Sequence, residues 1–184
     1  MARSRSAQTS WPAAFPALFA DSHIDYADCR LGFTIRPVPE DLVARLHLIA
    51  LTPERHVIVC RSSQGWRFLP GGTREDGESL VELARRELVE EAGARMTGPM
   101  DIFASHVADS LRSEPYRPHL PHPRSYWAYA VTWADVVGPP TNPPDGEQVL
   151  EVVTLPPALA ADYLGSHDPL HANVVRLAQA IGAI

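Results

Sequence analysis

The sequence contains no lysine, so all 16 of its basic residues are arginines. Acidic residues outnumber them, 22 to 16, and the formal net charge is -6. A protein with this charge is not attracted as a whole to nucleic acid or to an anionic membrane surface. We therefore expect neither nucleic acid nor a membrane as a partner, and any polyanion that binds must be held at a local site.

Cysteines and long apolar runs are also scarce. The two cysteines, Cys29 and Cys60, have neither a CxxC spacing nor a histidine at metal-ligand spacing, which predicts reduced thiols in the core. No segment reaches the roughly 18 apolar residues that a membrane span needs. Prolines and polar residues interrupt the N-terminal segment, which therefore lacks the apolar run of a signal peptide. These features predict a cytoplasmic protein.

Length and composition predict one folded domain. The chain has 184 residues, of which 45% are hydrophobic, and this is too apolar for a disordered protein. Residues 1–25 show no period and are predicted to form a mobile or loosely packed arm, which leaves residues 26–184 as the domain. The oligomeric state is open between a monomer and a homodimer in which the arm and a strand over residues 30–37 pair.

Strands precede and follow one long helix. This helix begins after Ser79, which fits a capping box with Glu82, and ends at Gly93, which suits a left-handed cap. Residues 157–164 and 170–181 predict shorter helices. Apolar or alternating runs predict a hairpin of two strands over 46–51 and 56–60, and further strands over 30–37, 66–69, 102–107, 126–136 and 148–155. This order predicts an α/β or α+β fold with helices on the faces of a sheet.

Three glutamates share one face of the long helix. Glu87, Glu90 and Glu91 fall within an arc of about 100°, and carboxylates at i and i+4 repel each other unless a cation lies between them. The alternative is an exposed face with ordinary ion pairs, because Glu82, Arg86 and Glu90 are spaced by four residues. The helix alone leaves both interpretations open.

The loop before the helix favours a ligand site. Gly71 and Gly72 allow the backbone to approach a ligand closely, and a loop that enters a helix N-terminus commonly holds phosphate. Carboxylates, carbonyls and water are the ligands that Mg²⁺ or Mn²⁺ prefers, and substrate phosphates complete the shell. We therefore predict a divalent-metal phosphate site between Gly72 and Ala94.

Residues 72–94 read GTREDGESLVELARRELVEEAGA, which resembles the Nudix box. Ala94 is the one soft departure, being smaller than the usual aliphatic residue, and it affects packing rather than chemistry. The resemblance implies a Nudix-like α/β/α sandwich with a mixed β-sheet. The matching positions are Gly72, Glu78, Arg86, Glu87, Leu88, Glu90, Glu91 and Gly93.

The resemblance also implies an activity, namely metal-dependent hydrolysis of a diphosphate bond. The substrate would be a small molecule of the nucleotide type, a nucleoside diphosphate linked to another moiety. Glu87, Glu90 and Glu91 would be side-chain ligands of Mg²⁺ or Mn²⁺, and Gly72 would offer its carbonyl.

Two further roles follow from the resemblance. Arg86 and Glu78 would pair and brace the loop against the helix. Glu87 or Glu90 would activate the attacking water. Because the base in this family sometimes lies outside the box, Glu147 is a further candidate, with an ordinary loop carboxylate as the alternative.

Candidate substrate-binding residues lie outside the box. Arg112, Arg117 and Arg124 belong to a proline-rich loop, and arginine forks suit phosphate, although an exposed surface loop explains the composition equally well. His119 and His122 lack a nearby carboxylate or cysteine, which argues against a metal pair. Several aromatic residues could stack on a base or fill the core: Trp66, Phe68, Tyr126, Trp127, Tyr129 and Trp133.

Two other functions stay open at this point. A catalytically silent Nudix-like domain would sense a nucleotide or bind a partner protein, and an incomplete box would favour it, whereas this box is complete. A structural helix in an unrelated fold is the other alternative. The sequence does not identify the substrate.

Overall fold

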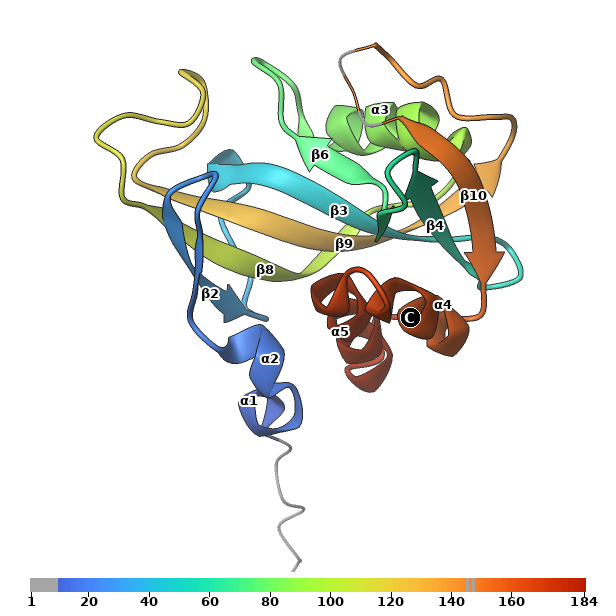
Figure 1. The fold of residues 1–184 in the computed structure, drawn as a ribbon, viewed down its shortest axis with the longest axis horizontal. Helices are drawn as coiled ribbons and strands as arrows, with labels where there is room; N and C mark the ends of the chain where they lie inside the picture. The colour runs from blue at the N-terminus through green and yellow to red at the C-terminus, as the bar shows by residue number, and fades with distance from the viewer. Residues whose placement is uncertain (1–9, 145, 147) are drawn as a thin grey trace, which may run out of the picture.

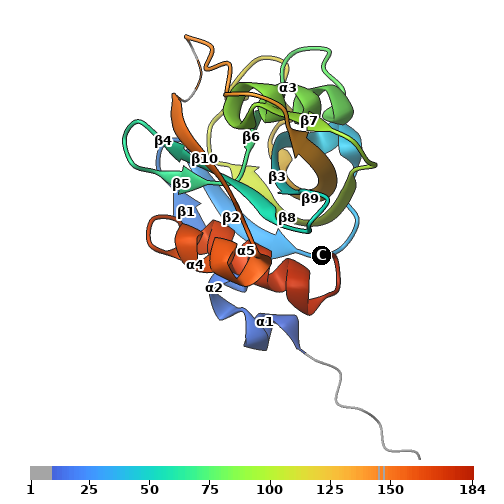
Figure 2. The ribbon, with the colours of Figure 1, turned by 90° about the vertical axis from the view of Figure 1, so that its right-hand side faces the viewer.

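The computed structural model describes residues 10–144, 146 and 148–184. A central sheet lies between two layers of helix (Figures 1 and 2). Helix α3 (Leu80–Ala92) covers one face, and α4 (Pro157–Gly165) and α5 (Pro169–Ala180) cover the other. The predicted α/β/α sandwich is therefore confirmed.

The sheet is mixed, as predicted. In the described part of the chain its order is β1-β2-β8-β9-β3-β4-β10, with β5, β6 and β7 paired beside this path. Strands β3 and β9 are parallel, and the other pairs are antiparallel. The strands are β1 (Ser22–Ile24), β2 (Cys29–Thr34), β3 (Val43–Leu51), β4 (Val57–Ser62), β5 (Arg67–Phe68), β6 (Gly71–Thr73), β7 (Ala94–Met96), β8 (Asp101–Ser110), β9 (Arg124–Val136) and β10 (Val149–Leu155).

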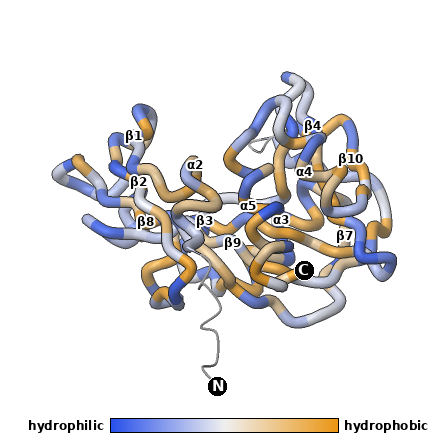
Figure 3. The backbone as a smooth tube through the Cα atoms, turned by 90° about the horizontal axis from the view of Figure 1, so that it is seen from below, coloured by the Kyte–Doolittle hydropathy of each residue, from blue (hydrophilic) through white to orange (hydrophobic). Residues whose placement is uncertain are grey.

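Strand β3 is buried on both faces, which explains its nearly continuous apolar sequence. Leu46 and Leu48 pack into the core beneath α3, whereas Ile49 and Leu51 belong to the core beneath α4 and α5. This alternation follows from the two-residue period of a strand. Figure 3 shows hydrophobic residues concentrated where helices overlap the sheet, and hydrophilic residues mainly in the peripheral loops.

Every strand predicted from the sequence is present. The hairpin of β3 and β4 is confirmed, with Leu51 opposite Val57. Strands β1, β6 and β7 are short and were not predicted. Strand β6 contains Gly71 and Gly72, and glycine is a poor strand former, so this strand depends on its pairing with β3.

The N-terminal segment packs against the domain where the structure describes it. Two short helices, α1 (Trp11–Ala14) and α2 (Pro16–Phe19), precede β1. Leu18 is 1% exposed and belongs to the core with α5. The predicted loose arm is thus structured from residue 10 onward, because Leu18 is buried and the partly buried Trp11, Phe15 and Phe19 pack against the core. Residues 1–9 lie outside the described chain.

A short 3₁₀ helix, η1 (Glu40–Leu42), leads into β3. The two cysteines, Cys29 and Cys60, are free and buried, as predicted. None of the described helices is long and apolar enough to cross a membrane.

Candidate active site

Helix α3 has the boundaries that the sequence predicts. The Ser79 hydroxyl accepts a hydrogen bond from the Glu82 amide, and the Glu82 carboxylate accepts one from the Ser79 amide, which completes the capping box. Gly93 ends the helix with a φ of 56° in the left-handed region. These two caps fix which side chains face the preceding loop.

Strand β6 brings two glycines against β3 and α3. Gly71 has a φ of 153°, and a Cβ atom there would lie 2.1 Å from the carbonyl oxygen of Leu46. A Cβ atom on Gly72 would lie 2.1 Å from Oε1 of Glu87. Gly71 therefore requires glycine, because a side chain there would meet the backbone of β3, and the absence of a side chain at Gly72 leaves room for the carboxylate of Glu87 beside the loop backbone.

Arg86 joins the loop to the helix. Its Nε and Nη2 groups donate to the two carboxylate oxygens of Glu78 at 2.8 and 3.1 Å. Its Nη1 group donates to Glu87 at 2.8 Å and to Glu90 at 3.2 Å, and Nη2 also donates to the carbonyl of Thr73. Arg86 and Glu78 thus form an ion pair between the helix and the loop, as the resemblance implies.

The charges in this network affect one another. Burial raises the pKa of Glu87, and the neighbouring guanidinium of Arg86 only partly opposes this effect. Burial also acts to raise the pKa of Glu78, but hydrogen bonds from Arg86 and from the Glu75 amide outweigh it, so this pKa is lowered. Glu78 in turn raises the pKa of Arg86. An added cation would therefore favour the charged form of the Glu87 carboxylate.

Glu91 approaches the same loop from the next turn of the helix. Its carboxylate accepts a hydrogen bond of 2.8 Å from the Gly71 amide. Its backbone carbonyl accepts a hydrogen bond from the thiol of Cys60 on β4. Glu91 is thus held between the loop and the sheet.

These carboxylates line one acidic pocket of about 250 Å³. Carboxylates suit a hard divalent cation, and the absence of a Cβ atom at Gly72 leaves space beside Glu87, so the residues present fit such an ion. Among the described residues no ready-made group of three or more such ligands is present. Instead, Glu87 and Glu90 accept from Arg86. The acidic pocket is lined by Gly71, Gly72, Thr73, Glu75, Arg86, Glu87, Glu90, Glu91, Arg117, Pro143 and Gly146.

In a comparison with protein families, the NUDIX domain model matches residues 43–177. The chain belongs to the Nudix family. This family assignment, with the complete box, makes the protein a Nudix-type hydrolase that acts on pyrophosphate bonds. The family acts on small-molecule substrates of the nucleotide type.

A solved structure of low sequence identity shares the fold of this Nudix protein. A mutant of the Bacillus subtilis pyrophosphohydrolase BsRppH is 14% identical, with a TM-score of 0.53 over 74% of this chain and 77% of that one. The M. smegmatis Nudix hydrolase RenU is 16% identical, with a TM-score of 0.46 over 77% of this chain and 86% of that one. No curated protein sequence matches the chain.

The three arginines proposed to bind substrate lie in different places. Arg117 lines the acidic pocket of this Nudix protein. Arg112 donates to the carbonyl of Tyr26. Arg124 forms a two-bond ion pair with Asp109, at 2.6 and 2.9 Å, which the sequence did not predict. The structure therefore brings only Arg117, of these three, to the box.

The other sequence candidates also have definite places. Glu147 lies outside the described residues, whereas its neighbour Gly146 lines the acidic pocket. His119 and His122 each contact a backbone carbonyl, those of Arg74 and Arg112, so the two rings do not form a metal pair.

The aromatic residues divide between core and surface. Tyr129 is buried and contacts His106, so it belongs to the core of this Nudix fold. Trp66 is exposed. Trp127 lines a second pocket that adjoins the acidic one and includes Arg45, a residue that no sequence pattern marked.

Proposed function

We propose that this Nudix hydrolase cleaves a diphosphate bond in a nucleoside diphosphate linked to another moiety, and that it requires Mg²⁺ or Mn²⁺. The observation that carries the proposal is the convergence of Glu87, Glu90 and Glu91 on one pocket beside the backbone of Gly72. The ion pairs of an exposed helix face do not by themselves require three acidic residues to line a pocket together with Gly71 and Gly72.

The metal would be held by the three glutamates and by the carbonyl of Gly72. When bound, it would neutralise phosphate oxygens and stabilise the charge that develops on the leaving group. The buried carboxylate of Glu87 supports this assignment, because burial raises its pKa and a neighbouring cation would favour its charged form.

The other residues position the reacting groups. Arg86 holds Glu87 and Glu90 through one guanidinium and ties both to Glu78, so the acidic face keeps its geometry against the loop. Arg117, at the other side of the pocket, offers a cation to a phosphate group.

Glu87 and Glu90 are the described candidates for the general base that accepts a proton from water. A base works best when its pKa lies close to the working pH, and burial moves the pKa of Glu87 in that direction. Glu147 stays a third candidate, because Gly146 beside it lines the acidic pocket.

A substrate panel tests this function. Nucleoside triphosphates, nucleotide sugars, ADP-ribose and dinucleoside polyphosphates would be incubated with the protein in EDTA, in Mg²⁺ and in Mn²⁺, and the phosphorylated products identified. We expect metal-dependent release of a nucleoside monophosphate from at least one compound. A nucleotide-induced rise in melting temperature without any product would contradict the proposal and favour the catalytically silent alternative.

A further inference from the structure

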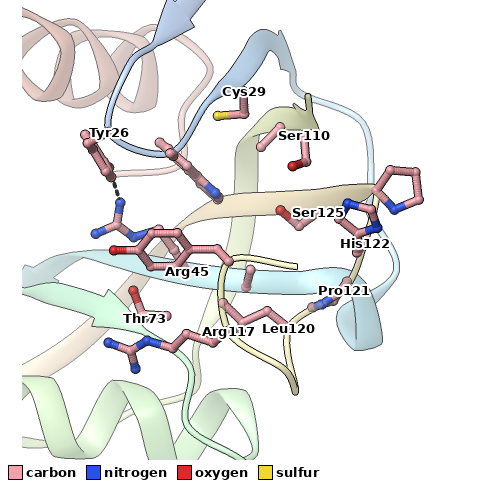
Figure 4. Close-up of a pocket in the computed structure, with 16 residues that line it drawn as sticks. Tyr26, Cys29, Arg45, Thr73, Ser110, Arg117, Leu120, Pro121, His122 and Ser125 are labelled. Atoms are coloured by element: carbon pink, nitrogen blue, oxygen red, sulfur yellow. Dashed lines mark hydrogen bonds between the residues drawn. The ribbon is translucent and has the colours of Figure 1, made fainter. Parts of the chain in front are cut away.

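The second pocket lies against the acidic one and is built by five strands. Cys29 of β2, Arg45 of β3, Thr73 of β6, Ser110 of β8 and Ser125 of β9 all line it. The loop between β8 and β9 covers it, and Figure 4 shows Arg117 and Thr73 on the side of the pocket that faces α3. We call it the arginine pocket.

Two residues connect the arginine pocket to the acidic pocket. Thr73 and Arg117 line both of them. A substrate whose diphosphate lies beside Glu87 can therefore extend into the arginine pocket without leaving the protein surface. The arginine pocket has a volume of about 170 Å³, which is below the range of roughly 300–1,000 Å³ for pockets that hold a whole drug-sized ligand. Its size suits one ring system of a larger substrate.

Arg45 is held in place on the wall of this pocket. Its guanidinium lies 5.0 Å from the ring centre of Trp127 and 5.9 Å from that of Tyr26. Its Nη1 group donates a hydrogen bond to the hydroxyl of Tyr26, as Figure 4 shows. Contact with aromatic faces restrains a cation without using its N–H groups, so the Nη2 group and the second proton of Nη1 are left for a ligand.

One polar atom of Arg45 is buried and makes no hydrogen bond to the described residues. Within the described part of the chain, its Nε group has no hydrogen-bond partner. An unpaired buried donor is costly, and a guanidinium carries five donors and no acceptor. Nε is itself shielded from the pocket, so a ligand would meet the Nη groups of a guanidinium to which the described residues supply few acceptors.

The side chains around Arg45 also restrict the chemistry of the ligand. The described lining of the arginine pocket contains two arginines, Arg45 and Arg117, and no Asp, Glu, Asn or Gln. Its side chains therefore offer charged donors, and no carboxylate or amide oxygen, to the ring edge that faces Arg45. Tyr26, Tyr116 and Trp127 supply aromatic surface for a planar ring.

We propose that the arginine pocket binds the nucleobase of the substrate and that Arg45 selects guanine. Guanine presents two acceptors, O6 and N7, on one edge, and an arginine fork is their most common specific partner. Adenine presents an amine beside N7, and a pair of arginine donors cannot satisfy it. This inference rests on the proposed function for its substrate, but binding of a nucleoside monophosphate tests it without turnover.

The test compares GMP with AMP in binding, and guanine with adenine nucleotides in turnover. Isothermal titration in Mg²⁺ would measure both monophosphates with the wild type, Arg45→Met and Arg45→Lys. We expect the wild type to bind GMP about 10-fold to 100-fold more tightly than AMP. Both variants should lose most of this ratio, since lysine keeps the charge but lacks the fork.

A matched control uses the same substitution at another arginine that lies over a tryptophan. Arg55, in the turn between β3 and β4, lies 5.9 Å from the ring centre of Trp133, and it is not part of either pocket. Arg55→Met should keep both the affinity and the preference for GMP. Far-UV circular dichroism would show whether each variant is folded. If Arg45→Met does not fold, Arg45→Lys alone still tests the role of Arg45.

Three results would overturn the assignment. Equal binding of GMP and AMP by the wild type would show that the pocket does not select guanine. An Arg45→Lys variant that keeps the wild-type ratio would show that Arg45 does not read the base, and an equal loss for both nucleotides in Arg45→Met would show that it contacts a phosphate. Failure of the proposed function is a different outcome, because no nucleotide would then be hydrolysed even if GMP were preferred in binding.

Discussion

Replacement of Arg86 by methionine should destabilise the protein strongly in the absence of divalent metal. The side chain of Arg86 is 22% exposed, and its partners Glu78 and Glu87 are 10% and 8% exposed. Removal of one partner from a buried ion pair costs about 3–5 kcal/mol. Because Arg86 is partly exposed, we expect a loss near the lower limit, about 3 kcal/mol.

Urea unfolding in EDTA, followed by tryptophan fluorescence, measures this loss. With an m value of about 2 kcal/mol/M, the midpoint of Arg86→Met should fall by about 1.5 M. Mg²⁺ should restore part of the difference, because a cation between the carboxylates replaces the lost positive charge.

The neighbouring Arg85 provides the control. It is exposed on the same helix, so Arg85→Met should change the stability by no more than about 0.5 kcal/mol. If both variants unfolded at the same urea concentration, the network around Arg86 would not hold the loop against the helix, and the reasoning would be wrong.

Three further changes have definite expected results. Gly72→Ala should lower kcat/KM about 100-fold, because its Cβ atom would displace the Glu87 carboxylate. Gly138→Ala is the control and should keep full activity, since the space around Gly138 is open. Equal activities of the two variants would contradict this account. Burial lowers the pKa of His106 from 6.5 to about 4, so the unfolded state binds more protons between these values and stability should fall as the pH drops from 6.5 to 4. The free energy of unfolding should fall by about 3 kcal/mol over this range. Urea unfolding of a His106→Gln variant tests this prediction, and a midpoint with the same pH dependence as the wild type would refute it. Ser79→Ala removes the capping box and should lower Tm by about 3 °C, and an unchanged Tm in a thermal scan would show that the cap does not limit stability.

Local signals in the sequence were sufficient to predict the main helix and the box. The limits of α3 follow from Ser79 and Gly93, whose roles depend only on neighbouring residues. The contact of Arg86 with Glu78 was expected from the resemblance to the Nudix box, and the structure contains it. The apolar runs of β3 and β4 reflect burial and needed no tertiary information.

Features that depend on distant pairing could not be predicted. Strand β6 exists because β3 lies beside it, although its glycines disfavour a strand. Arg124 meets Asp109 only through the register of β8 and β9. Arg45 reaches Trp127 through the parallel pairing of β3 and β9, which no local pattern reveals.

The packing of the N-terminal segment is another such feature. Helices α1 and α2 each have only four residues, so they are stable only because Leu18 and Phe19 contact the core. The cytoplasmic location, the homodimer and the role of Glu147 stay predictions.

The most direct test of the central claim is the Glu91→Gln variant, assayed for metal-dependent product release with the best substrate of the panel. Glutamine can still accept the hydrogen bond from the Gly71 amide, so the fold should survive, and only the charge offered to the metal is lost. We expect an intact circular dichroism spectrum, weaker Mn²⁺ binding and no measurable turnover in Mg²⁺. Near-normal turnover in this variant would contradict the assignment of the acidic pocket as the catalytic metal site.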